Sequence, residues 1–105
     1  MVNLPVPAYS DGAAVREMVA THWLPRLQQH RPQLVLFSAG FDAHREDEMG
    51  QLALVEDDFA WMTEQVMAVT QPYAGGRAVS VLEGGYDFSS LGRSVAAHIR
   101  AMAGL

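Results

Sequence analysis

The sequence predicts an α/β fold in which helices cover both faces of a parallel sheet. Short apolar runs alternate with longer amphipathic runs along the 105 residues, and this alternation is typical of strand–helix units. In the apolar runs at 33–38 and 78–82, hydrophobic side chains occur at both parities. Such strands are usually buried on both faces, as in a parallel sheet that lies between two layers of helices.

The first helix is expected over about 13–29, where apolar residues recur near helical spacing. Pro25 should kink this helix, because a proline lacks a backbone donor and its ring clashes with the preceding turn. Pro32 should end it. The expected apolar stripe consists of Val15, Met18, Val19, Trp23 and Leu27.

Two further helices follow the predicted strands. The second is expected over about 56–71 with Pro72 as its stop, and the third should begin near Ser89 or Ser90, either of which can cap it. The expected buried stripes are Phe59, Met62, Val66 and Val69 on the second helix, and Leu91, Val95, Ile99 and Met102 on the third.

These elements are too few to close an α/β sheet. Strands that are apolar on both faces need paired neighbours and two helix layers, and an average sheet has about 5 to 6 strands. The length alone would permit a self-sufficient domain, but the pattern favours missing strands and exposed edges. We therefore expect residues 1–105 to be part of a larger α/β domain.

Composition excludes several classes of function. A formal net charge of −5 disfavours direct nucleic-acid binding, which needs clustered basic side chains. The absence of cysteine excludes disulfides, thiolate zinc sites and cysteine nucleophiles, so any metal site must use His, Asp or Glu. No apolar run approaches the ~18 residues of a membrane span, and the first residues do not resemble a signal peptide. We expect a cytoplasmic protein that does not enter a membrane.

Polar residues follow both predicted strands. The loops at 38–44 and 83–87 contain Asp42 and Tyr86, each placed shortly after a glycine. Working residues of open α/β sheets lie in loops at the carboxyl ends of strands. The separation of Asp42 and Tyr86 fits one strand–helix–strand crossover, so both should lie at the same edge of the sheet.

Spacing alone leaves several roles open for these residues. Asp42 could be a helix cap or a loop carboxylate satisfied by backbone amides, or it could chelate a metal together with His44. Tyr86 could be a packed loop aromatic instead of a catalytic phenol. Gly84 and Gly85 could cradle a phosphate, although neither the dinucleotide-binding nor the Walker pattern is present.

Other polar residues are assigned no function from the sequence. His22 and His30 belong on or just after the first helix, and His98 belongs on the third, where a surface or core-edge imidazole is the default interpretation. The charged run at 45–48 is interpreted as a solvated loop.

Longer stretches of the chain match one family in order and spacing. Residues 34–45 (LVLFSAGFDAHR) resemble the strand and metal loop of the class II histone deacetylase family in its bacterial branch, which includes acetylpolyamine amidohydrolases and acetoin-utilisation proteins. Residues 80–87 (SVLEGGYD) resemble the tyrosine loop of that family. Residues 93–98 resemble its closing helix, and 3–7 resemble the stretch before the first helix. The resemblance covers nearly the whole chain.

This resemblance implies the C-terminal part of a three-layer α/β/α, arginase/deacetylase-like catalytic domain that binds Zn²⁺ through an Asp, a His and a second Asp. Asp42 matches the second aspartate. Tyr86 matches the tyrosine that donates to the developing oxyanion. His44 is expected to support the loop, and Gly84 and Gly85 should let the chain turn tightly enough to bring Tyr86 over the metal.

The family's other two ligands and its histidine pair lie N-terminal to the matched region. The resemblance therefore implies a segment of a zinc-dependent deacetylase that acts on acetyl-lysine or acetylated polyamines and is inactive alone. It should pair with an N-terminal segment or with itself. Two rival hypotheses are a non-catalytic module that docks through an exposed sheet edge and a small Rossmann-like nucleotide binder.

Overall fold

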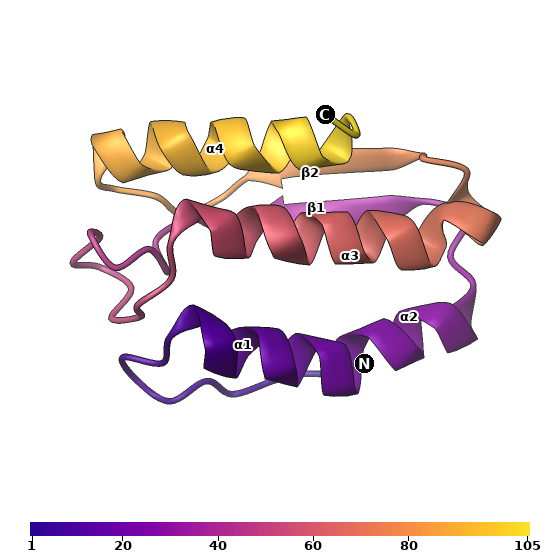
Figure 1. Ribbon diagram of the computed structural model, residues 1–105, viewed down its shortest axis with the longest axis horizontal. Coiled ribbons are helices and arrows are strands. Elements are labelled where there is room, and N and C mark those ends of the chain that lie inside the picture. The colour runs from indigo at the N-terminus through magenta and orange to yellow at the C-terminus, as the bar shows by residue number, and fades with distance from the viewer.

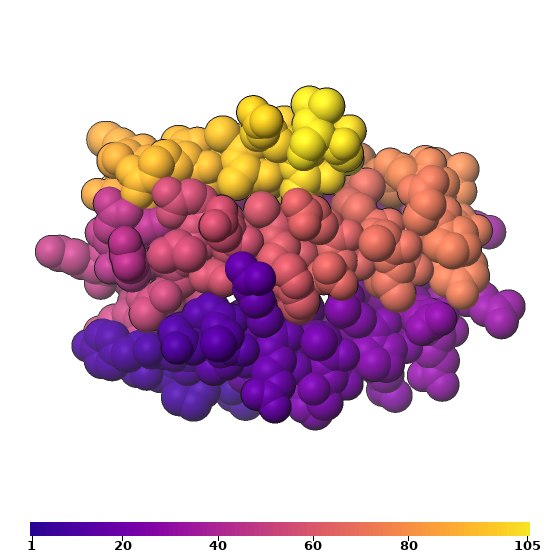
Figure 2. All heavy atoms as spheres, in the orientation of Figure 1, coloured from indigo at the N-terminus to yellow at the C-terminus, as the bar shows by residue number.

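The computed structural model describes residues 1–105 as a row of helices packed on one face of a two-stranded parallel sheet (Figure 1). From the helix side, the helical rows lie against one another and cover the sheet (Figure 2). No helix combines the length and apolar character that crossing a bilayer requires. The elements are α1 (Gly12–Met18), η1 (Val19–Trp23), α2 (Leu24–His30), β1 (Val35–Ala39), α3 (Glu56–Ala74), β2 (Ala78–Leu82) and α4 (Phe88–Met102).

The first three helical segments form one uninterrupted run. The irregularity expected at Pro25 takes the form of the π-helical turn η1, in which the N–H of Leu24 donates to the carbonyl of Val19, five residues back. A wider turn just before a proline eases the clash of its ring with the preceding carbonyls. The run ends at His30 with Arg31 in a left-handed conformation, so the predicted stop before Pro32 is confirmed.

Helix α3 is longer than predicted, and the prediction that Pro72 stops it is wrong. The helix continues to Ala74 and ends where Gly75 adopts a left-handed conformation and donates to the carbonyl of Gln71. Pro72 is exposed in the last turn, where its missing N–H removes only one bond from a helix that is about to end.

The buried side of α3 also differs from the predicted stripe. Phe59 and Val66 are buried and Met62 packs against the larger apolar cluster as expected. Thr63 and Thr70 are also buried, whereas Val69 is only partly covered. The hydroxyls of Thr63 and Thr70 donate to the carbonyls four residues back, at 2.8 and 2.7 Å. Because these bonds satisfy the hydroxyls, a threonine can replace an aliphatic side chain at a tight helix contact.

Helix α4 begins at Phe88, one or two residues before the predicted start, and its cap is Asp87, whose carboxylate accepts the N–H of Ser90. Leu91 and Val95 pack against the larger apolar cluster as predicted, but Ile99 is exposed. The fully buried side of the helix consists of small or polar residues, namely Ser90, Ser94, His98 and Ala101.

His98 is buried, contrary to the surface or core-edge interpretation, and its ring joins three elements. Its Nδ1 lies 2.7 Å from the Thr63 hydroxyl on α3, and its Nε2 lies 2.8 Å from the Ser80 hydroxyl on β2. Thr63 donates its only hydroxyl proton to a carbonyl, so Nδ1–H donates to Thr63 and Nε2 accepts from Ser80. This arrangement uses the neutral imidazole, and burial lowers the pKa of His98.

The sheet has one covered face and one bare face. Strands β1 and β2 pair in parallel, with Val35 opposite Ala78 and Ala39 opposite Leu82. Val35 and Phe37 point toward α2 and α3, whereas Leu36, Val79 and Val81 are 71%, 50% and 57% exposed. Of the three layers expected, this chain supplies the sheet and one layer of helices.

Replacing Val79 and Val81 together by threonine should reduce self-association of the isolated chain. The two valines contribute apolar surface on the bare face, and exposed apolar faces drive association. Sedimentation velocity would measure the change, with Ile99→Thr as the control because Ile99 is equally exposed on α4. A wild-type chain that remains monomeric at high concentration would contradict this expectation.

Acidification should destabilise the fold through His98. A histidine whose pKa is lowered in the folded state contributes stability above its ordinary pKa of 6.5, and this contribution is lost as the pH falls below that value. Urea unfolding between pH 8 and 5 should show this loss for the wild type and a smaller loss for His98→Gln, which still hydrogen-bonds but does not titrate. His22→Gln, which removes an exposed imidazole, should behave like the wild type.

Candidate functional site

The structure brings the two predicted loops together at the carboxyl ends of the strands. The N–H of Glu83 donates to the carbonyl of Ala39 at 2.8 Å, and the N–H of Phe41 donates to the carbonyl of Gly84 at 2.7 Å. These bonds continue the pairing of β1 and β2 beyond the last strand residues. The segments that contain Asp42 and Tyr86 therefore leave the sheet side by side.

The Asp42 carboxylate lies against the backbone of the neighbouring loop. A Cβ atom on Gly84 would stand 2.7 Å from Oδ1 of Asp42, and one on Gly40 would stand 3.2 Å from the same oxygen. A Cβ atom on Gly50 would collide with the Asp42 carbonyl. Three glycines thus leave the room that this half-buried aspartate occupies, and any side chain at Gly84 would displace the carboxylate.

Two of the roles left open for Asp42 are not observed. Helix caps are provided by other residues, so Asp42 is not one. The aspartates that accept backbone N–H bonds are Asp11, Asp47, Asp58 and Asp87. The Asp42 carboxylate is half-buried. It accepts no hydrogen bond from the protein, which leaves its oxygens available to a cation.

The His44 ring hydrogen-bonds within the protein through both nitrogens, so neither nitrogen is free to chelate a metal with Asp42. Its side chain is fully buried, Nδ1 accepts the N–H of Glu46 at 3.1 Å, and Nε2 donates to the carboxylate of Glu56 at 2.7 Å. Because both ring nitrogens are occupied, His44 does not form the Asp-x-His chelate considered for this loop. Its hydrogen bond to Glu56 connects the loop to the first turn of α3.

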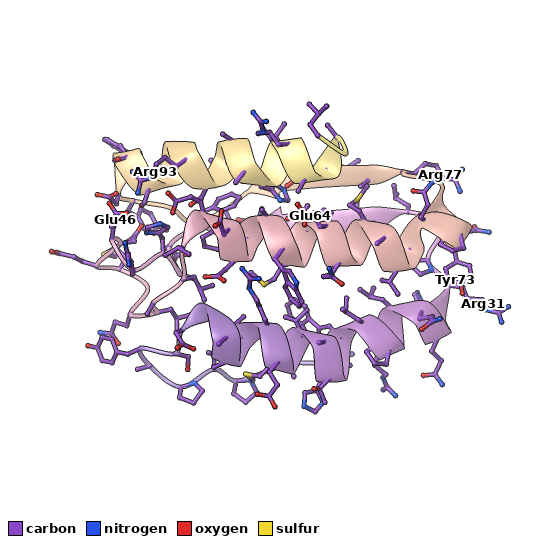
Figure 3. All side chains as sticks on the ribbon, in the orientation of Figure 1. Arg31, Glu46, Glu64, Tyr73, Arg77 and Arg93 are labelled. Carbon is purple, nitrogen blue, oxygen red and sulfur yellow. The ribbon has the colours of Figure 1, made fainter.

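Glu56 and Arg93 extend this connection to α4. Arg93 donates to Glu56 through Nε at 2.6 Å and also contacts Glu46 and Ser89; Figure 3 shows Arg93 and Glu46 at the same end of the molecule. The hydrogen bond from His44, followed by the bonds from the backbone and from Arg93, lowers the pKa of Glu56 to about 2. The carboxylate therefore stays charged at neutral pH and holds three segments together.

Asp47 is the exception to the interpretation of 45–48 as a solvated loop, since Arg45, Glu46 and Glu48 are exposed as expected. Its side chain is buried, with 4% of the residue exposed. One carboxylate oxygen accepts the N–H groups of Tyr86 and Asp87 at 2.7 and 3.1 Å, and the other accepts the N–H of Met49 at 2.9 Å. The bond from Tyr86 is the main reason that the pKa of Asp47 lies below its ordinary value.

Sequence reasoning missed Asp47, Glu56 and Arg93. The local part of the Asp47 arrangement, a side chain bonded to the N–H two residues on, is a common turn pattern that a sequence can suggest. Its long-range partners, Tyr86 and Asp87, leave no such signal, because they lie about 40 residues away in the chain.

The Tyr86 side chain is free at this site. Tyr86 is 58% exposed, and its hydroxyl makes no hydrogen bond within the chain. The preceding Gly85 has φ = +149°, and a Cβ atom there would press on Leu91, so this position requires glycine. The backbone of the tyrosine loop is thus tightly placed, whereas the phenol projects without a partner.

A complete metal site is not present among these residues. No group of three or more His, Cys, Asp or Glu side chains converges in a way that could hold an ion, whereas a catalytic zinc takes three protein ligands. Asp42 has the free carboxylate that a single ligand needs. The chain can therefore supply one ligand of such a site.

The sequence pattern that defines the histone deacetylase domain matches residues 1–102. The chain belongs to the histone deacetylase family. It is 43% identical to the type-2 histone deacetylase 2 of Dictyostelium discoideum over 97% of this chain and 6% of that protein. It is 38% identical to the polyamine deacetylase HDAC10 of Homo sapiens over 98% of this chain and 15% of that protein.

A solved structure of the histone deacetylase Clr3 confirms the predicted fold. It superposes with a TM-score of 0.89 at 30% sequence identity, over 99% of this chain and 17% of that one. The deacetylase-like α/β architecture and the family resemblance predicted from residues 34–45 and 80–87 are therefore confirmed. The chain spans a minor part of the relatives it matches, from 6% to 30% among the first curated ones.

Gly84→Ala should move the Asp42 carboxylate and destabilise the chain by less than the ~1 to 3 kcal/mol of core overpacking, because the new methyl group collides only with the end of a half-buried side chain that can rotate aside. Gly92→Ala is the matched control. It adds the same methyl group in open space on α4 and should stabilise the chain by roughly 0.5 to 1 kcal/mol through helix propensity. Urea unfolding of both variants tests the contrast, and equal effects would contradict it.

Proposed function

We propose that this chain is a segment of a zinc-dependent deacetylase domain that hydrolyses the acetyl amide of acetyl-lysine or of acetylated polyamines. The observation that carries the proposal is the free Asp42 carboxylate beside the tyrosine loop in a chain of the histone deacetylase family. One relative is named a type-2 histone deacetylase and another a polyamine deacetylase, and these names correspond to the two substrate classes.

Asp42 has the proposed role of one metal ligand. The glycines around it leave room for a carboxylate that no protein donor occupies, and an oxygen ligand of this kind suits zinc. The chemistry that the bound ion supplies is polarisation of the acetyl carbonyl and of a water molecule. His44, whose ring nitrogens are both engaged, has the proposed role of supporting the loop that contains Asp42.

Tyr86 has the proposed role of donating its phenolic hydrogen to the acetyl oxygen as negative charge develops there. A single well-placed donor of this kind contributes about 3 to 4 kcal/mol to the transition state. The exposed and unpartnered phenol is free to make that bond. Gly84 and Gly85 allow the close approach and tight turn that place Tyr86 beside the Asp42 loop.

Because the chain supplies one ligand and no three-ligand group, we propose that it is inactive alone. The remaining ligands and the general base would come from a segment that completes the domain. The cytoplasmic location expected from the sequence stays a prediction.

The bare sheet face favours a second candidate function. Leu36, Val79 and Val81 form an apolar surface with no partner in this chain, as a docking module would need. This alternative predicts tight association with a completing segment or with a second copy, without any gain of deacetylase activity. A deacetylation assay of this chain joined to a completing segment separates the two functions.

Asp42→Ala and Tyr86→Phe should fail in different ways when this chain is joined to the matching N-terminal part of a relative. Asp42→Ala should lower both zinc content and turnover, because it removes a ligand. Tyr86→Phe should keep normal zinc content while turnover falls by about 10²- to 10³-fold, since the hydroxyl matters chiefly in the transition state. Metal analysis and a deacetylation assay measure the two effects.

His44→Ala is the control for this pair. It should lower stability more than zinc content, because the ring bonds Glu56 instead of an ion. Retained zinc in Asp42→Ala, or near-full turnover in Tyr86→Phe, would show that the proposed roles are wrong.

A further inference from the structure

Asp47 holds the tyrosine loop through the backbone of that loop. Three backbone N–H groups converge on its buried carboxylate, two from the tyrosine loop and one from its own loop. The bond from the N–H of Tyr86 is the shortest of the three, at 2.7 Å. Charge-assisted bonds of this kind are stronger than bonds between neutral groups, so this carboxylate is a firm attachment point for the loop.

Asp47 is itself fixed relative to the helices. Its N–H donates to the carbonyl of His44 at 2.9 Å, and the His44 ring is anchored to Glu56 on α3. A continuous series of bonds therefore runs from α3 through His44 to Asp47 and from there to Tyr86. The position of the Tyr86 backbone is set by a helix that is distant in the sequence.

Side-chain packing does little to hold the tyrosine loop. Tyr86 and Phe88 are both largely exposed, and Gly85 has backbone freedom that other residues lack. On the β1 side, the bond from Phe41 to Gly84 fixes the loop two residues before the tyrosine. Asp47 supplies the bond that fixes Tyr86 itself. Asp87, the next residue, is held both by Asp47 and by its capping bonds with Ser90.

We infer that Asp47 is a positioning residue that sets the location of the Tyr86 phenol by holding the Tyr86 backbone N–H; this inference rests on the catalytic role proposed for Tyr86. The N–H is one bond from the Cα atom on which the phenol is carried, so a shift of the backbone moves the hydroxyl directly. Misplacement of a reacting group by about 1 Å can cost about 100-fold in rate.

Hydrogen exchange in the 105-residue chain tests the contact without any need for activity. The amides of Tyr86 and Asp87 should exchange slowly in the wild type. Asp47→Asn should speed their exchange, because it removes the charge and leaves one acceptor oxygen for three N–H groups, while the amides of α3 stay protected. Glu48→Gln is the matched control, because Glu48 is an exposed acid in the same loop and should leave exchange unchanged. Unchanged protection of Tyr86 in Asp47→Asn would overturn the inference.

If Asp47→Asn does not fold, Asp47→Glu keeps both acceptor oxygens on a longer side chain. It should fold and give exchange rates for Tyr86 and Asp87 between those of the wild type and those of an unprotected amide. Protection equal to that of the wild type would mean that the length of this side chain does not place Tyr86, which would also overturn the inference.

A double-mutant cycle in the joined, zinc-loaded domain tests the catalytic consequence. Asp47→Asn should lower kcat by up to about 100-fold with KM and zinc content unchanged, and it should cause no further loss when Tyr86 is already phenylalanine. An equal loss in the Tyr86→Phe background would show that Asp47 acts only on stability and would overturn the inference.

Different results would reject the catalytic role of Tyr86 and the positioning role of Asp47. Near-full turnover of Tyr86→Phe alone would overturn the catalytic role of Tyr86. It would also overturn the effect on turnover that is proposed for Asp47. In that case slow exchange of the Tyr86 amide would still be lost in Asp47→Asn. Unchanged exchange together with impaired Tyr86→Phe would reject Asp47 and retain the role of Tyr86.

Discussion

The hydrogen bond between His44 and Glu56 is the interaction on which the arrangement of both loops depends. It lies between a fully buried imidazole and the first residue of α3, so it fixes where the loop after β1 lies relative to the helix layer. Glu56 in turn binds Arg93 on α4. The same bond therefore places the segment that contains Asp42 relative to the helix that follows Tyr86.

Buried polar groups, together with the larger apolar cluster, join α3 to α4 and the sheet. Thr63, Ser80 and His98 form one chain of hydrogen bonds across three elements, and Ser90 and Ser94 are also buried between the helices. Small side chains let the helices approach closely, while the requirement that each polar group find a partner restricts the fold to one arrangement. The Ser94 hydroxyl is the exception, since it has no partner.

Much of the fold was predictable because its signals are local. The alternation of apolar runs and the prolines indicated the strands and the first helix end, and the matched segments, above all the two loops, indicated the family. The errors came where burial depends on neighbours. Helical spacing favoured Val69 and Ile99 as core residues, but threonine, serine and histidine face the tight contacts, because the polar atoms of Thr63 and His98 find partners there.

The sequence by itself determined the fold class, the family and the two loops in which Asp42 and Tyr86 lie, since strand pattern and motif spacing are properties of neighbouring residues. Only the tertiary structure decided that His44 faces Glu56 and not Asp42, and that Gly84 must lack a side chain to admit the Asp42 carboxylate. It alone assigned Asp47 to the backbone of Tyr86. These contacts join segments that are separated by 12 to 42 residues, and such pairings arise from the packing of whole elements and leave no periodic signal in the chain.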